Sequence, residues 1–168
     1  GGLIAARTVL DAATDYQTLI LTGPLLGVPT PPPAWQTCLL RTLSALFPAA
    51  KALEIDASAV SRDQAVVDDY VADPLVHHEN IPARTVVSLF DEASAVLGRA
   101  SEISLPTLLL HGEEDVLTSV PASRQFMADL SATDKHITVY PGMYHELFNE
   151  PEKEEIIRTC LDWIATRL

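Results

Sequence analysis

Residues 106–145 read PTLLLHGEEDVLTSVPASRQFMADLSATDKHITVYPGMYH, and this stretch decides the fold. The apolar run 107–111 is typical of a buried strand, and residues 119–130 place apolar side chains at helical spacing. Residues 136–140 then alternate as a second strand would. A strand, a helix and a strand within roughly 30 residues predict a βαβ unit with two parallel strands. The stretch therefore predicts the α/β class, a parallel sheet with flanking helices.

Two loops of this unit carry an acid and a base. The carboxyl ends of parallel strands meet at one edge of the sheet, so the loops after Gly112 and Gly142 should open side by side. Asp115 lies on the first loop and His145 on the second. A carboxylate beside an imidazole fixes its tautomer and leaves the far nitrogen free to take a proton from a hydroxyl nucleophile. We therefore predict that Asp115 and His145 are catalytic.

The start of the chain fits the same chemistry. Gly1 and Gly2 lead into a helical pattern over residues 2–13, which is typical of the end of a nucleophile elbow. In α/β-hydrolases the chain order is Ser, then the acid, then His, and Asp115 followed by His145 fits this order. We expect the nucleophilic Ser just before Gly1. The chain would then be the C-terminal part of an α/β-hydrolase fold, with the N-terminal half of the sheet outside it.

Simpler interpretations exist for each polar residue. An Asp after a strand is commonly a turn residue or a helix cap, and a single loop His is ambiguous. The order of Asp115 and His145 on neighbouring loops favours the functional interpretation. His77 and His78 are adjacent, so their side chains diverge, and with no third ligand evident we predict no metal site. His136, at a strand start, is expected to be exposed.

The rest of the chain is expected to be helical around one more strand, residues 18–22. No strand is evident from residue 28 to about 80, so we predict a helical cap inserted into the sheet protein. The division is core 1–27, cap 28–87 and core 88–168. We expect a helix near 35–47 with most of its apolar face in the core, and another over about 83–100. Between them, Ser61 and Gln64 form a capping box. The last helix is expected to have Pro151 near its start and Arg167 in its last turn.

Length and composition predict one globular domain. The chain has 168 residues, of which 48% are hydrophobic, enough for one packed core. Asp and Glu number 23 against 11 Lys and Arg, and the net charge is -12, so we exclude nucleic acid as a partner. No apolar run reaches the ~18 residues of a membrane span. Cys38 and Cys160 lack disulfide or metal spacing, and we expect buried or half-buried thiols.

Three stretches resemble the monoacylglycerol lipases of the α/β-hydrolase fold, particularly the bacterial members. They are AVSRDQAVVDDYVADPLVHH at 59–78, LPTLLLHGEEDVL at 105–117 and VYPGMYHELFNEPE at 139–152. The resemblance implies that Asp115 is the triad acid, that His145 is the base, and that Gly1 and Gly2 end the elbow GHSxGG. It also implies that the cap forms a tunnel for the acyl chain, into which Leu25 and Leu117 look. The oxyanion-hole amides would belong to residues upstream.

The function implied by this resemblance is hydrolysis of a monoacylglycerol through an acyl-enzyme, without a metal or organic cofactor. The required partner is the N-terminal part of the same protein, which would carry the Ser and the oxyanion hole. Transient contact of the cap with a membrane surface is also implied. Two alternatives stay open: a lysophospholipase or general carboxylesterase with the same triad, and a non-catalytic lipid-binding module.

Overall fold

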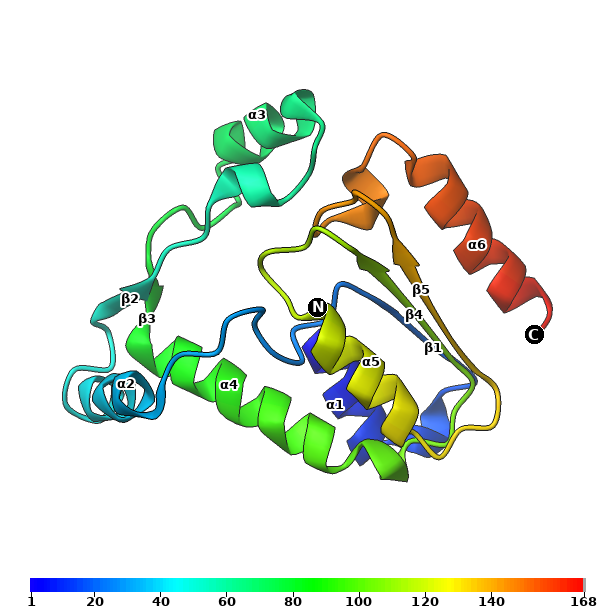
Figure 1. Ribbon diagram of the computed structural model, residues 1–168, viewed down its shortest axis with the longest axis horizontal. Helices are drawn as coiled ribbons and strands as arrows, with labels where there is room; N and C mark the ends of the chain where they lie inside the picture. The colour runs from blue at the N-terminus through cyan, green and yellow to red at the C-terminus, as the bar shows by residue number, and fades with distance from the viewer. Residues whose placement is uncertain (168) are drawn as a thin grey trace.

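The computed structural model describes residues 1–167 and contains a three-stranded parallel sheet (Figure 1). Its strand order is β1 (Leu19–Thr22), β4 (Thr107–Gly112) and β5 (Lys135–Tyr140). Leu109, in the central strand, pairs with Leu21 on one side and Ile137 on the other. The helix α5 (Val120–Asp129) joins β4 to β5. The predicted βαβ unit is therefore confirmed.

Helices cover both faces of this sheet (Figure 1). One face packs against α1 (Gly2–Asp11), α4 (Ala83–Gly98) and α5, and the other packs against α6 (Lys153–Ala165). Leu109 shares a buried cluster with Phe126 of α5, whereas Leu108 and Leu110 pack with Ile156 of α6. Each such side chain contributes about 2 kcal/mol when it is fully buried. The alternation along β4 thus fixes which helices lie on which face.

The segment between β1 and α4 extends away from the sheet (Figure 1). It contains α2 (Ala34–Leu46), α3 (Gln64–Ala72) and two short antiparallel strands, β2 (Lys51–Leu53) and β3 (Ile81–Pro82). The expectation of no strand between 28 and about 80 was wrong, because strands of two or three residues leave no periodic pattern. Short 3₁₀ turns also occur, at Ala13–Asp15, Ala57–Ala59, Ala100–Glu102 and Leu147–Asn149.

Some local expectations fail for reasons that the contacts show. Asp63, not Ser61, caps α3 by accepting from the Ala65 amide, while the Ser61 hydroxyl donates to the carbonyl of Asn149. Arg167 lies beyond the end of α6, where its guanidinium stacks 3.2 Å from the Trp163 ring centre. The helix begins at Lys153, two residues after Pro151.

The expected burial of the 35–47 helix was also wrong. Trp35 is 65% exposed and Leu39 is 61% exposed, and the only buried residue of α2 is Ser44. Cys38, in the same helix, is exposed, while Cys160 is buried as expected, and burial raises the pKa of its thiol. His136 is exposed, as predicted.

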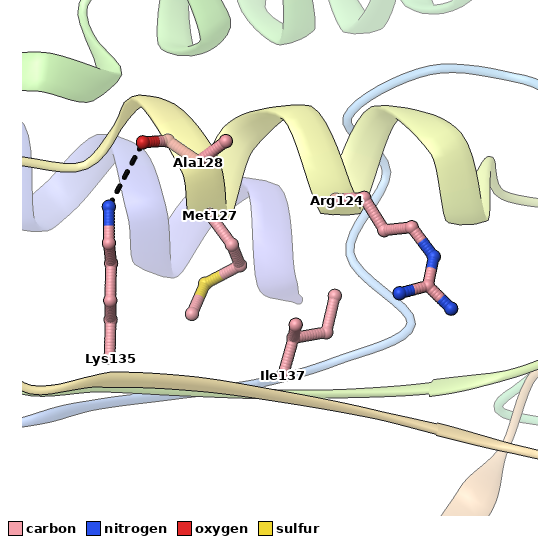
Figure 2. A pocket seen from close by; sticks show the side chains of 5 residues that line it. All are labelled: Arg124, Met127, Ala128, Lys135 and Ile137. Atoms are coloured by element: carbon pink, nitrogen blue, oxygen red, sulfur yellow. Dashed lines mark hydrogen bonds between the residues drawn. The ribbon is translucent and has the colours of Figure 1, made fainter.

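Among residues 1–167, no helix combines the length and apolar character that crossing a membrane requires. A hollow of about 330 Å³ lies between α5 and the start of β5, away from the loops that carry Asp115 and His145. Figure 2 shows Met127 and Ile137 on its walls, with the Lys135 ammonium donating to the Ala128 carbonyl at 3.0 Å. Lys135 also donates to the carbonyl of Leu130, so it closes the end of α5.

Candidate active site

The carboxylate of Asp115 is surrounded by hydrogen-bond donors. Its Oδ1 accepts from the backbone amides of Leu117, at 2.8 Å, and Thr118, at 2.9 Å. Its Oδ2 accepts from the Thr118 hydroxyl at 2.7 Å and from Nδ1 of His145 at 2.8 Å. The side chain is fully buried. The tight turn after β4 therefore holds the carboxylate in one orientation, aimed at the neighbouring loop.

Burial alone would raise the pKa of Asp115, because it disfavours the charged form. Contacts with His111, His145 and Thr118 act in the opposite direction and prevail, so the pKa of Asp115 lies well below its usual range. The group is thus a carboxylate at neutral pH. A buried anion bound to one imidazole nitrogen stabilises the protonated form of that ring.

The imidazole of His145 stands at the other side of this contact. Its side chain is 27% exposed. Nδ1 makes the bond to Asp115, and Nε2 has no hydrogen-bond partner within residues 1–167. A hollow of about 230 Å³ opens beside it, lined by Thr22, His145, Glu146, Leu147, Phe148 and Asn149. The structure therefore brings the two predicted catalytic residues together and leaves one ring nitrogen open to a reacting group.

The loop that carries His145 crosses directly over the end of β4. A β-carbon placed on Gly112 would overlap the backbone carbonyl oxygens of Met143 and Tyr144. The amide of Glu114 donates to the Met143 carbonyl at 3.0 Å, which ties the acid and base loops together. The absence of a side chain at Gly112 therefore sets the distance between Asp115 and His145.

The base loop is also tied to the segment before α3. Glu150 is 1% exposed, and its carboxylate accepts from the backbone amide of Tyr144 at 3.1 Å and from Nε of Arg62 at 2.5 Å. The Arg62 guanidinium also pairs with Glu152. The backbone adds a bond from the Glu146 amide to the Val60 carbonyl at 2.8 Å. We call Arg62 and Glu150 the loop clamp, because they hold the backbone next to His145.

Sequence reasoning missed the loop clamp and His111. His111 is fully buried at the end of β4, with Nε2 3.1 Å from Asp115 Oδ2. The signal was an ionisable residue closing an apolar strand run, four residues before an acid. No local signal pointed to Arg62 and Glu150, because their contact joins segments 88 residues apart.

The two predicted substrate-binding residues lie elsewhere in the structure. Leu25 is half-buried and packs against the main core cluster. Leu117 is half-buried, and its backbone amide donates a hydrogen bond to the Asp115 carboxylate. Neither lines the hollow beside His145 or the larger one. Their role in a tunnel stays a prediction.

His77 and His78 do not form a metal site with other described residues. No group of three or more His, Cys, Asp or Glu side chains in residues 1–167 is placed to hold a metal ion. The ring of His78 packs edge-on against Tyr70, and its Nε2 contacts the Asp73 carbonyl at 3.1 Å. The contacts of His78 are therefore with the end of α3 and the turn that follows it.

Comparisons with known proteins identify the family and the fold. The sequence model of the family described as "Serine aminopeptidase, S33" matches residues 1–152. The monoacylglycerol lipase of Mycolicibacterium smegmatis is 35% identical over 154 residues, or 92% of this chain and 55% of that protein. The monoglyceride lipase of Rattus norvegicus is 28% identical over 100% of this chain and 56% of its own length.

Among solved structures, the monoacylglycerol lipase of Paleococcus ferrophilus matches with a TM-score of 0.90 and 29% identity, over 100% of this chain and 66% of that one. The chain spans a little over half the length of the curated relatives above. The predicted α/β-hydrolase fold and the resemblance to monoacylglycerol lipases are confirmed. The chain belongs to the serine aminopeptidase S33 family.

Proposed function

We propose that the complete protein containing this chain is a serine hydrolase that cleaves monoacylglycerols to a fatty acid and glycerol. The observation that carries the proposal is the bond from His145 Nδ1 to the buried carboxylate of Asp115, beside a hollow that His145 helps to line. Only the base and the acid of a triad are needed from this chain. The nucleophilic Ser and the oxyanion-hole amides would come from residues before Gly1.

The chemistry runs in two half-reactions. The Ser oxygen attacks the ester carbonyl carbon while His145 Nε2 takes the hydroxyl proton. The imidazolium then returns this proton to the glycerol oxygen as the ester C–O bond breaks, leaving an acyl-enzyme. Water then attacks the acyl-enzyme while His145 takes its proton, and the proton returns to the Ser oxygen as the fatty acid leaves. Asp115 orients the ring and balances its positive charge in both halves.

The start of α1 supports a Ser immediately before it. A β-carbon on Gly2 would lie 2.8 Å from Cβ of Pro24, so this end of α1 packs on the turn after β1. In the same turn, Gly23 has φ +48°, and a β-carbon there would lie 3.1 Å from His145 Nδ1. The turn thus contacts both the start of α1 and the imidazole. The positive end of the α1 dipole would also favour the anion formed during acyl transfer.

The relatives support an ester substrate. The family description names a peptidase, but the similar proteins from M. smegmatis and R. norvegicus are named as lipases of a monoacylglycerol. We assign the acyl chain to the cap, residues 28–87, with Leu25 and Leu117 at the inner end of its path.

The first test is labelling with a fluorophosphonate, which reacts only with an activated serine, followed by intact-mass analysis. We expect one adduct on the complete protein and none on its His145→Ala variant. The matched control is His136→Ala, because His136 is exposed on β5 and lies away from the site, so it should label as the parent does. An unlabelled parent would contradict the proposed function.

Substrate class is tested by rates on a monoacylglycerol, a lysophospholipid, a short soluble ester and an aminoacyl anilide. We expect the highest kcat/KM on the monoacylglycerol. A higher kcat/KM on one of the other three substrates would contradict the proposed substrate class but not the proposed triad.

A further inference from the structure

The proposed chemistry does not use His111, although this imidazole lies against the same carboxylate as His145. Its Nε2 is 3.1 Å from Asp115 Oδ2, the oxygen that His145 Nδ1 approaches at 2.8 Å. Its Nδ1 is 3.0 Å from the Ser123 hydroxyl on α5. Both ring nitrogens are thus engaged in a fully buried site. The groups around the ring determine which nitrogen carries the proton.

The position of this proton follows from the Thr118 hydroxyl. Asp115 is ionised and accepts from this hydroxyl at 2.7 Å, so the single hydroxyl proton points at the carboxylate. The Thr118 oxygen also lies 3.1 Å from His111 Nε2, and it can only accept there. Nε2 must therefore be the protonated nitrogen. In this tautomer Nδ1, 3.0 Å from the Ser123 hydroxyl, accepts from it, which completes the network.

We propose that His111 is a positioning residue for the acid–base pair, whose Nε2–H holds Asp115 Oδ2 in place and competes with His145 for that oxygen. The inference rests on the proposed hydrolase function and adds to it a residue outside the triad. A carboxylate oxygen shared among several donors is a weaker acceptor for each of them. His111 should consequently limit how strongly Asp115 Oδ2 binds Nδ1 of His145.

Other charged groups near His145 do not reproduce this effect. The turn after β1 presents Thr22 and Gly23, which do not titrate. Around the loop, the titratable or charged groups include Asp115, His111, Glu114, Glu146 beside the hollow, and Glu150 with Arg62, which also pairs with Glu152. Within the described residues, Asp115 Oδ2 is the atom that both imidazoles contact. A change at His111 should therefore reach His145 through Asp115.

The first experiment needs no variant. The complete protein is labelled with ¹⁵N-histidine, and NMR reports the protonation state of each ring. We expect a proton on Nε2 of His111. A ring that carries its proton on Nδ1 alone would overturn the proposal, because its Nε2 could not then donate toward Asp115.

The second experiment compares His111→Gln, whose amide nitrogen can occupy the Nε2 position and donate, with His111→Leu, which cannot. For His111→Leu we expect the acid limb of the kcat/KM profile to move to higher pH by about half a pH unit, because Asp115 Oδ2 then has one imidazole donor fewer. His111→Gln should keep the acid limb near that of the parent. If His111→Leu only lowers kcat at every pH, with the acid limb unmoved, His111 has a merely structural role.

The two proposals fail in different ways. Absence of a fluorophosphonate adduct on the parent protein refutes the hydrolase function. The NMR measurement of the proton position on the His111 ring decides whether His111 can donate to Asp115, without any turnover.

Discussion

The backbone carbonyl of Tyr144 occupies the space that a β-carbon on Gly112 would need. Gly112→Ala should therefore push the base loop off β4 and separate His145 from Asp115. We expect a loss of most hydrolysis by the complete protein and of about 2 kcal/mol in the free energy of unfolding, measured by urea denaturation. Gly98→Ala is the matched control, because a β-carbon there has no atom within 4 Å and should be tolerated. Equal behaviour of the two variants would contradict this account of the loop.

Asp115→Asn should keep the shape of the acid and lose its charge. The amide no longer favours the required tautomer of His145 and cannot balance the imidazolium, so kcat should fall by about 10⁴ with little change in KM. Asp129→Asn, an exposed position at the end of α5, serves as the control. The measurement is steady-state kinetics. A decrease in kcat of less than about tenfold would contradict the role of Asp115 as the triad acid.

Stability should depend on pH through the same carboxyl. The folded pKa of Asp115 lies below its ordinary value of 3.8, so its ionised form stabilises the fold above that value. This contribution decreases as pH falls from about 4 toward the folded pKa. The gap in unfolding free energy between the parent and Asp115→Asn should be constant above about pH 5 and shrink below about pH 4. A gap that does not change down to about pH 2.5 would contradict the lowered pKa.

The loop clamp should matter for both stability and rate. Glu150→Gln removes a buried charge from Arg62 and turns one acceptor oxygen into a donor group, which should cost about 2 kcal/mol. Looser placement of His145 should reduce kcat roughly tenfold. Glu152→Gln is the control, since its side chain is 45% exposed and such pairs contribute at most about 1 kcal/mol. Similar effects at the two positions would show that the clamp does not act on the loop.

The sheet and the meeting of Asp115 with His145 were predictable because they follow from local patterns. The strand runs and the crossover helix determine where each loop opens, and both residues follow a strand within a few positions. The catalytic role of the pair stays a prediction that the experiments above address.

Side-chain partners across long separations were not predictable. The Ser61 hydroxyl matched a capping pattern, yet it donates to the Asn149 carbonyl 88 residues away. The apolar face of the Trp35 helix looked like core, but periodicity shows only that a face is apolar and does not show what covers it. His111 closes a strand, and its inward orientation depends on Thr118 and Ser123, which only the folded chain brings to it.

The separation of 88 residues between Arg62 and Glu150 has a consequence for the time course of folding. Contacts between distant segments form late, because they close long stretches of chain. The pairing of β4 with β5 joins segments much closer in the chain, so it should form before the loop beside His145 is secured, as pulsed hydrogen exchange during refolding can show. Recovery of turnover would then be the last step, and a chain that already appears native to a spectroscopic probe would still be an inactive enzyme.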